Sequence, residues 1–415
     1  MESSLSPYAA LLTALCQIPV LHYLVAFWIF SFIYLYNFLE FHFFQDLLGG
    51  GTPIGLIYHP SSELYKTVVS KCKVLNARYW ATPWVSSPHL MTCFLRFLGK
   101  SPDCTYTREI FRTPEGGTLA LDWLLSSNVS GAGSQGNNKI SKDDTTRIVI
   151  VIPGLSSDGN SNYIKQFAFH MARSGWNVLV SNHCGMGGVQ ITYPRFYTAG
   201  GTEDLRTVIN YIHNEYPKAP LFVVGTSIGA NILVKYLGEE GEKTPIAGAA
   251  AVCNPWDLLI GDRFIDRKPK QRFYDRALAA GLKRYAAKYA RRLREYDTHA
   301  ACMLSNFETA DAYYRMNSSA SYALTISVPL LCINALDDPV CSKETIPFDE
   351  CRANKNIVLA TTQHGGHLAF LEGFAGGMWW VRAVNEFLDV LYSNPCKPVQ
   401  KEPYVNGKEN GFHLL

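Results

Sequence analysis

Residues 225–229 of the 415-residue chain read GTSIG, which fits the pattern G-x-S-x-G. The pattern follows a short apolar run, residues 221–224, and precedes residues 231–237, which have helical periodicity. A sharp strand-to-helix turn holds such a serine in strained backbone geometry, and the glycines leave room for neighbouring backbone. The helix dipole also favours a developing negative charge there. Ser227 is therefore the predicted nucleophile, and the alternative is a glycine-rich turn whose serine only caps the helix.

A serine hydroxyl is a weak nucleophile that needs a histidine base, which a carboxylate in turn orients. In chains with this serine motif the order is Ser, then Asp or Glu, then His. The apolar run 328–334 is followed by Asp337 and Asp338, at the end of an expected strand. Asp338, directly before Pro339, is the predicted orienting acid. Asp337 is the alternative, and whichever carboxylate is not used is expected to hydrogen-bond or cap the loop.

The base is expected after the next apolar run, residues 357–361, where His364 and His367 compete. His367 is the predicted base, because the two glycines before it let the loop bend into the site. His364 and His367 also form a His-x-x-His pair, which could bind zinc, but no third ligand stands at a suitable spacing. The sequence therefore predicts neither a metal nor a cofactor.

Two backbone N–H groups are expected to stabilise the oxyanion of an acyl-transfer intermediate. One belongs to the residue after the nucleophile, Ile228, and the other to a loop after an earlier strand. Residues 151–155 end the first buried apolar run and open a loop rich in glycine and serine, so Leu155 is the second predicted donor.

The elements that position these residues follow from the periodicity of the chain. Residues 107–112 and 118–123 flank a turn and predict a β-hairpin. Downstream, apolar runs alternate with helical patterns, which predicts a mostly parallel sheet covered by helices on both faces, as in an α/β-hydrolase fold. The predicted strands are 147–152, 177–182, 221–224, 246–253, 328–334 and 357–361, and the predicted helices cover 163–173, 203–216, 231–237 and 379–391.

The N-terminal part of the chain contains a candidate membrane anchor. Residues 11–39 contain no Asp, Glu, Lys or Arg, and residues 20–36 are dense in large apolar side chains. This run is long enough to cross a bilayer as a helix, which Pro19 suits as a starting point. We expect an anchor over residues 1–45 with a helix at about 20–39. The alternatives are a cleaved signal peptide and a monotopic hairpin or buried helix, and charge does not indicate the orientation.

Four parts of the chain are expected from the changes in pattern. After the anchor, residues 46–104 form a connecting region, residues 105–392 form the α/β-hydrolase domain, and residues 393–415 form a polar tail. The alternation of predicted strands and helices is interrupted over residues 255–327, which predicts a helical cap. Residues 262–295 of this cap contain twelve Lys or Arg against four Asp or Glu, including Arg291, Arg292 and Arg294. They form either a solvated helical face or a surface that approaches anionic lipid.

Composition restricts the class of protein. With 47% hydrophobic and 18% charged residues the chain is globular, and its net charge of +3 does not indicate nucleic acid. The apolar run at residues 20–36 makes a bilayer an expected partner, and no nucleic acid is expected.

Six short motifs follow one another along the chain: residues 153–155 (PGL), 182–185 (NHCG), 225–231 (GTSIGAN), 254–257 (NPWD), 337–339 (DDP) and 364–368 (HGGHL). Taken in this order, they resemble the type-4 branch of the AB-hydrolase superfamily, which holds membrane-anchored lipases and esterases and the plant embryogenesis-associated proteins. The resemblance covers about residues 106–392. It implies a carboxylic ester hydrolase acting on monoacylglycerols, phospholipids or short acyl esters, with the triad on Ser227, Asp338 and His367. Cys184 departs from the pattern, because relatives usually have Arg there.

Two other functions use or retain the same fold. An acyltransferase would pass the acyl group to an alcohol other than water with the same triad, and a membrane scaffold would keep the fold without the chemistry. The chain is expected in a membrane as a single-pass protein, with an endomembrane such as the endoplasmic reticulum as its location.

Overall fold

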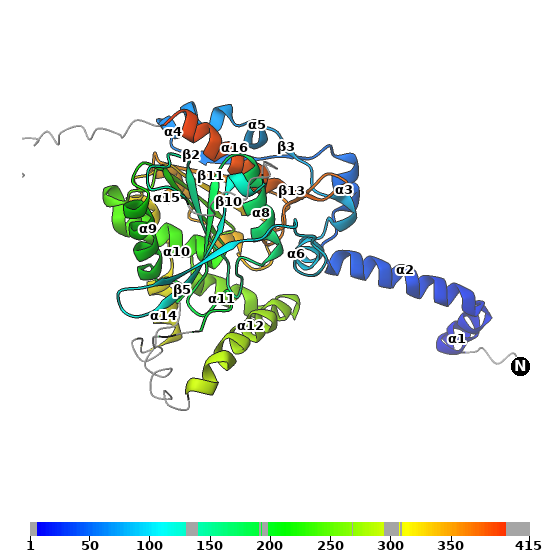
Figure 1. Ribbon diagram of the computed structural model, residues 1–415. Coiled ribbons are helices and arrows are strands. Elements are labelled where there is room, and N and C mark those ends of the chain that lie inside the picture. Colours follow the sequence, from blue (N-terminus) through cyan, green and yellow to red (C-terminus); the bar gives the residue numbers. More distant parts are fainter. Residues whose placement is uncertain are drawn as a thin grey trace, which may run out of the picture.

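A twisted sheet of nine strands forms the centre of the computed structural model (Figure 1), which describes residues 6–129, 140–190, 192, 198–267, 269–293, 307 and 309–395. The strand order is β2-β11-β10-β9-β8-β6-β7-β5-β4. The six strands from β11 to β7 are parallel to one another, whereas β2, β5 and β4 pair antiparallel with their neighbours at the two edges. The strands are β2 (Gly55–Tyr58), β4 (Thr107–Arg112), β5 (Thr118–Leu124), β6 (Ile148–Ile152), β7 (Asn177–Ser181), β8 (Leu221–Thr226), β9 (Gly248–Val252), β10 (Leu330–Ala335) and β11 (Ile357–Thr362).

Helices cover both faces of the sheet because its parallel strands are apolar on both sides. In β6, Ile148, Ile150 and Ile152 point to one face, while Val149 and Val151 point to the other, and all are buried. The helices α8 (Asn162–Arg173) and α16 (Trp379–Ser393) cover the face of the two valines. The opposite face is covered by α9 (Glu203–Glu215) and α10 (Ile228–Glu240). The α/β-hydrolase architecture predicted from the sequence is thereby confirmed.

The predicted strands and helices that build this domain are present, and apart from the helical segment at residues 231–237 their ends shift by no more than two residues. The helical segment predicted at residues 231–237 lies inside the longer helix α10. The predicted hairpin is formed by β4 and β5, which pair from Thr107 opposite Trp123 to Arg112 opposite Thr118.

The region predicted to connect the anchor to the domain is instead an integral part of the domain. Strand β2 pairs with β11 and extends the sheet at one edge. Apolar side chains of the following short elements, among them Val68, Leu75 and Met91, are buried in the same core as α8 and α16. Between residues 43 and 97 these elements are α3 (Phe43–Leu48), β1 (Thr52–Pro53), α4 (Glu63–Thr67), η1 (Val69–Lys71), α5 (Lys73–Asn76), β3 (Arg78–Tyr79), η2 (Pro83–Val85) and α6 (Pro88–Phe97).

Two helices precede the domain, and α2 projects away from it (Figure 1). The first, α1 (Pro7–Gln17), ends just before Pro19, which is the N-cap of α2 (Val20–Phe38). Its 19 residues give α2 a length of about 28 Å. None of its residues is buried, and within the described residues it alone is long and apolar enough to cross a membrane.

The segment between β9 and β10 contains no strand in its described residues and consists of helices joined by short loops. Its helices are α11 (Leu258–Arg267), α12 (Pro269–Leu293), α14 (Ala310–Asn317) and η4 (Ala320–Thr325). Arg294 lies outside the described residues, as do the side chains of Arg291 and Arg292 and the tail from residue 396 onward. The remaining short elements of the chain are α7 (Ser126–Val129), η3 (Gly241–Lys243), η5 (Lys343–Thr345), α15 (Phe348–Ala353), β12 (Leu371–Glu372) and β13 (Gly377–Met378).

The root of this helical segment is held by residues 254–257 of the NPWD motif. The Trp256 side chain is fully buried, and its indole N–H donates to Asn334 Oδ1 at 3.1 Å. Asn254 Nδ2 donates to Ser319 Oγ at 3.1 Å, at the return of the segment to the sheet. Asp257 Oδ1 accepts the N–H groups of the first turn of α11, as an N-terminal capping carboxylate does. Both ends of the segment are thus fixed to the strand ends around the site.

Candidate active site

Ser227 lies in the sharp turn between β8 and α10. Its φ of 53° and ψ of −121° are uncommon for a residue other than glycine. The close backbone packing explains the flanking glycines. A Cβ on Gly225 would lie 2.5 Å from the carbonyl oxygen of Gly229, and a Cβ on Gly229 would lie 2.4 Å from the carbonyl oxygen of Ile152. The Ser227 side chain makes no capping hydrogen bond to α10, unlike the capping serine of the alternative interpretation.

The hydroxyl of Ser227 instead meets a histidine that is held by a carboxylate. His367 Nε2 lies 3.0 Å from Ser227 Oγ, and His367 Nδ1 lies 2.9 Å from Asp338 Oδ2. If Nδ1–H donates to the carboxylate, Nε2 is left to accept the serine proton, which is the arrangement a general base requires. Asp338 is buried, and its Oδ1 also accepts the N–H groups of Val340 and Cys341 at 2.8 and 2.9 Å.

The neighbouring pair, Asp337 and His364, is directed elsewhere. Asp337 Oδ2 lies 3.3 Å from His364 Nδ1, and Asp337 Oδ1 accepts the N–H of Gly366 at 3.0 Å. Burial raises the pKa of Asp337, while its contacts with His364 and Gly366 oppose that rise. The two adjacent carboxylates therefore point in different directions, and Asp337 holds the loop that carries His367.

Behind this second pair lie ionisable residues from the segment just after α2. The ring of His42 packs on the ring of His364 with centroids 4.2 Å apart. Asp46 is buried, its Oδ2 has no hydrogen-bond partner within the described residues, and burial raises its pKa to about 6. This group joins residues about 320 positions apart in the chain, and no local pattern in the sequence indicates it.

Helix α6 holds the backbone of the base. Thr92 Oγ1 accepts the N–H of His367 at 2.9 Å and donates to the carbonyl oxygen of Pro88 at 2.7 Å. Gly366 has a φ of +56°, and a Cβ there would lie 2.7 Å from the same Pro88 oxygen. Sequence reasoning did not identify Thr92, because it lies in the part of the chain interpreted as a connection.

The two predicted oxyanion donors flank the serine. Ile228 is the first residue of α10, and Leu155 follows Gly154, where a Cβ would lie 3.2 Å from Ser227 Cβ. Within the described part of the chain, the N–H groups of Leu155 and Ile228 donate to no backbone carbonyl outside regular elements and to no side chain. The preceding peptide is held by Tyr163, whose OH accepts the N–H of Gly154 at 2.9 Å.

Residues 182–185, the NHCG motif, support the same loop from the neighbouring strand. His183 Nε2 lies 2.8 Å from the carbonyl oxygen of Pro153, and burial lowers the pKa of His183 to about 4. The ring is therefore neutral at pH 7, and its Nε2–H donates to that oxygen. Asn182 Oδ1 accepts the N–H of Gly159 at 2.9 Å. Cys184, where relatives usually have Arg, is buried in the core. The sequence analysis identified the NHCG motif, but it did not predict the contacts of the motif with the oxyanion loop.

Among the residues with described placement, one group of potential metal ligands lies close together, formed by Cys253, Asp338 and His367. Burial raises the pKa of Cys253 well above its usual value, so the side chain is a thiol. Its Sγ accepts the N–H of Leu368 at 3.4 Å. Metals bind the thiolate form, and an ion here would occupy the histidine and carboxylate beside Ser227. The group fits a hydrogen-bonded acid and base better than it fits a metal.

A protein-family comparison matches residues 143–373 to the family described as "Serine aminopeptidase, S33". The matched segment is more than half of the chain and contains Ser227, Asp338 and His367. Among curated proteins, embryogenesis-associated protein EMB8 of Picea glauca is 30% identical over 359 residues, which are 81% of this chain and 78% of that protein.

Two further relatives have names that state an activity. Phospholipase ABHD3 of Homo sapiens is 28% identical over 318 residues, covering 73% of this chain and 76% of that protein. Monoacylglycerol lipase ABHD2 of Danio rerio is 28% identical over 337 residues, covering 74% of this chain and 75% of that protein. The family match, the relatives and the fold agree with the resemblance found in the motifs: the chain belongs to the type-4 branch of the AB-hydrolase superfamily.

Proposed function

We propose that this chain hydrolyses carboxylic esters of lipids through an acyl-serine intermediate. The observation that carries the proposal is the continuous hydrogen-bonded chain from Ser227 Oγ through His367 to Asp338. Ser227 stands at the N-terminus of α10 and is only partly buried, so its hydroxyl can be reached by a substrate. A histidine between a serine and a buried carboxylate is the arrangement that activates a serine for acyl transfer.

In the first half of the reaction His367 Nε2 takes the hydroxyl proton as Ser227 Oγ attacks the ester carbonyl carbon. The N–H groups of Leu155 and Ile228 stabilise the resulting oxyanion. The intermediate collapses, the C–O bond to the alcohol breaks, and His367 gives its proton to the departing alcohol. Water then attacks the acyl-serine with His367 again as the base, and the acid product leaves with Ser227 regenerated.

The supporting contacts explain how the loop of the oxyanion site is kept in place. Tyr163 and the neutral His183 hold the N–H and the C=O of one peptide, between Pro153 and Gly154. This peptide directly precedes the one that carries the Leu155 N–H, so that N–H need not reorganise as charge develops. Loss of one such donor typically costs about 3 kcal/mol of transition-state stabilisation.

The substrate class is proposed from the relatives and from the anchor. The names of two relatives state phospholipase and monoacylglycerol lipase activity. Monoacylglycerols, phospholipids and short acyl esters are therefore the proposed substrates, and the apolar helix α2 would keep the enzyme where such lipids are found.

We also propose that α2 anchors the chain as a single-pass protein of an endomembrane such as the endoplasmic reticulum. In support, α2 is uncharged and has no buried residue. Carbonate extraction and imaging of a tagged full-length chain test this proposal. Release of the protein by carbonate would contradict the anchor.

The catalytic proposal is tested by labelling the full-length protein with a fluorophosphonate probe, which reacts with activated serines. Wild type and Ser70→Ala, an exposed serine used as a matched control, are expected to label, and Ser227→Ala is not. Hydrolysis of a monoacylglycerol, a phosphatidylcholine and p-nitrophenyl butyrate is followed with the same preparations, with an aminoacyl p-nitroanilide for comparison. Unchanged labelling of Ser227→Ala contradicts the nucleophile, and turnover of the anilide alone contradicts ester hydrolysis.

A further inference from the structure

Large apolar side chains are exposed on the domain beside the end of α2. Six of them, here called the apolar rim, come from α3, η2, α6 and the loop between β12 and β13. Such a concentration of exposed aromatic and aliphatic surface marks an interaction site rather than ordinary surface composition. The members and their exposed fractions are Phe44 (62%), Leu48 (79%), Trp84 (45%), Phe97 (73%), Leu98 (66%) and Phe374 (62%).

Direct contacts join the elements of the apolar rim. Trp84 Nε1 donates to the carbonyl oxygen of Phe374 at 3.1 Å, and the Trp84 ring packs edge-on against Phe94 with centroids 5.2 Å apart. Phe97 and Leu98 follow Phe94 by three and four residues, so they lie on the same side of α6.

Helix α3 is attached to the rim through Trp80. The Trp80 ring packs edge-on against Phe374 with centroids 5.2 Å apart. Trp80 Nε1 donates to the carbonyl oxygen of Asp46, inside α3, at 2.6 Å. Phe44 and Leu48, which are four residues apart, therefore extend the rim along α3.

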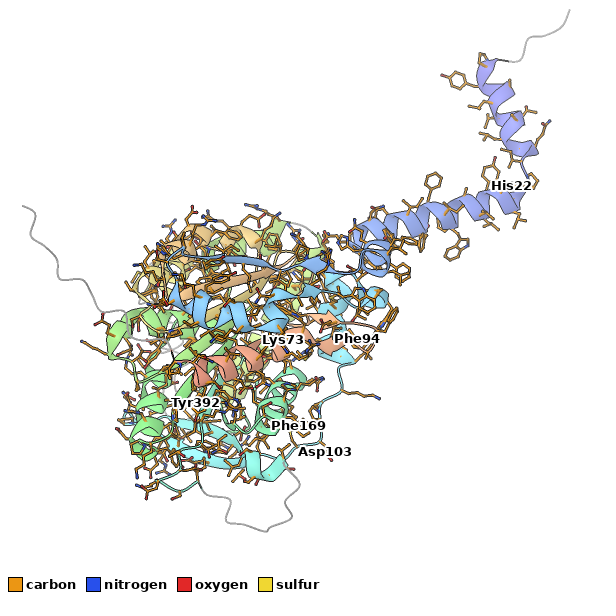
Figure 2. All side chains as sticks on the ribbon, turned by 90° about the horizontal axis from the view of Figure 1, so that it is seen from above. His22, Lys73, Phe94, Asp103, Phe169 and Tyr392 are labelled. Carbon is orange, nitrogen blue, oxygen red and sulfur yellow. The ribbon has the colours of Figure 1, made fainter. Side chains whose placement is uncertain are left out.

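The rim lies where α2 leaves the domain. Ser87 Oγ donates to the carbonyl oxygen of Leu39, directly after α2, and the N–H of His42 donates to Ser86 Oγ at 3.3 Å. Trp84 is two residues before Ser86, so the rim begins next to the last turn of the proposed anchor. In Figure 1, α3 and α6 surround the exit of α2, and Figure 2 places Phe94 on the same side of the domain.

The charges around the rim favour one occupant. From Leu64 to Pro102 the chain has six Lys or Arg and no Asp or Glu. Arg96 and Lys100 flank the exposed pair Phe97 and Leu98, and both are exposed. Apolar side chains bordered by basic ones suit a bilayer interface with anionic headgroups. Two acidic residues lie close to rim members in the chain, but Asp46 is buried and Glu372 pairs with Arg382 at 2.6 Å. An apolar surface with exposed basic neighbours that continues into an apolar helix is less suited to a soluble protein partner.

We infer that the apolar rim inserts into the interface of the bilayer that α2 spans, so that the domain docks on the membrane at a fixed orientation. This inference rests on the proposed anchor. The same α6 that contributes Phe97 and Leu98 holds His367 through Thr92, and His42 packs on His364. The docked surface is therefore built on the elements that fix the catalytic loop, which brings the site next to its lipid substrate.

A first experiment needs no disruptive variant. Full-length protein is reconstituted into vesicles of phosphatidylcholine and phosphatidylglycerol that carry bromine at a shallow acyl position, which quenches nearby tryptophans. The bromolipids are expected to quench a larger part of the tryptophan fluorescence of the wild type than of Trp84→Phe. Because Trp28 in α2 is present in both proteins, the difference in quenching reports on Trp84 alone. Equal quenching of the two proteins would overturn the inference, even if both proteins remain anchored.

A second experiment tests the consequence for activity. Leu48→Asp combined with Phe374→Asp is compared with a matched control, Ile110→Asp combined with Leu324→Asp, whose positions are 54% and 57% exposed on other parts of the domain. The rim variant is expected to hydrolyse a monoacylglycerol in vesicles about tenfold more slowly, because charge placed at the interface opposes docking. Its rate on p-nitrophenyl butyrate and its fluorophosphonate labelling are expected to match the control.

The outcomes separate docking from the proposals on which it rests. A loss on vesicles no larger than that of the control overturns docking. Absence of labelling in the wild type contradicts the catalytic proposal instead, and release of the wild type by carbonate contradicts the anchor and the inference together. If the rim variant also loses activity on the soluble ester, its loss on vesicles does not test docking. The quenching of Trp84 in the wild type then supports or overturns the inference.

Discussion

Replacing each of the two adjacent aspartates by asparagine distinguishes their roles sharply. Asp338 contacts His367 Nδ1 with both oxygens, at 2.9 and 3.2 Å, while its Oδ1 also accepts the N–H groups of Val340 and Cys341. An asparagine at this position has one oxygen and one NH₂ group. If the amide oxygen still accepts the backbone N–H groups, the NH₂ group faces His367 Nδ1. Nδ1 must then accept a hydrogen bond from it, and the imidazole proton lies on Nε2. That tautomer cannot take the proton of Ser227.

Asp338→Asn is therefore expected to lower kcat by about 10⁴, the effect of the wrong tautomer in a serine triad, which corresponds to about 5.5 kcal/mol. In Asp337→Asn the amide oxygen can still accept the N–H of Gly366, and the contact with His364 does not reach Ser227. We expect kcat to fall by no more than about thirtyfold, since the loss of one charged hydrogen bond in the loop is worth about 2 kcal/mol at most.

The assay measures kcat on p-nitrophenyl butyrate and the rate of fluorophosphonate labelling for both variants in the same detergent. Thermal unfolding serves as the control, because both variants must be folded for the comparison to be valid. A larger loss for Asp337→Asn than for Asp338→Asn would refute the assignment of Asp338 as the orienting acid. Equal losses of about 10⁴ would show that the two carboxylates act as one unit.

Three further variants test the supporting structure. Gly229→Ala is expected to lower the Tm by several degrees, because its Cβ would meet backbone oxygens at 2.4 and 2.5 Å, and an unchanged unfolding curve would contradict this close packing. Thr92→Val removes the acceptor of the His367 N–H and is expected to lower kcat about tenfold with little change in KM, whereas a pure KM effect would point to substrate contact instead. Asp46→Asn tests a buried acid whose pKa is raised to about 6: the folded state binds this proton more tightly than the unfolded state, so stability falls as pH rises from about 4 to 6. The variant is expected to be more stable than wild type by about 2 kcal/mol at pH 7 and equal to it at pH 4, and a gain at both pH values would remove ionisation as the cause.

The parts of the fold that could be predicted have local causes. The strands from β6 to β11 are mostly apolar along their length, because their residues are buried on both faces of the sheet. The elbow around Ser227 is recognisable because its two glycines are required by backbone contacts. Asp338 and His367 could be placed because the ends of parallel strands meet at one edge of the sheet.

The parts that could not be predicted depend on contacts between distant segments. Strand β2 has four residues and no periodicity of its own, and it is ordered by β11. Thr92, Tyr163 and His183 position the site through hydrogen bonds to backbone atoms. Any residue type offers the same backbone groups, so these contacts leave no signature in the residues that receive them.

The pairing of β2 with β11 also sets the order in which the chain can be completed. Gly55 and Thr361, which face each other in this ladder, are separated by 306 positions. During synthesis α2 and then β2 are made before the rest of the sheet. The partner of β2, strand β11, is made only after nearly the whole domain. Until β11 is made, β2 of the nascent chain is an unpaired strand close to the proposed membrane anchor. Such a strand can form hydrogen bonds with an incorrect strand. A chain that stops before residue 357 would keep the proposed anchor and β2 but lack β11, the strand with which β2 pairs, so its sheet would remain incomplete.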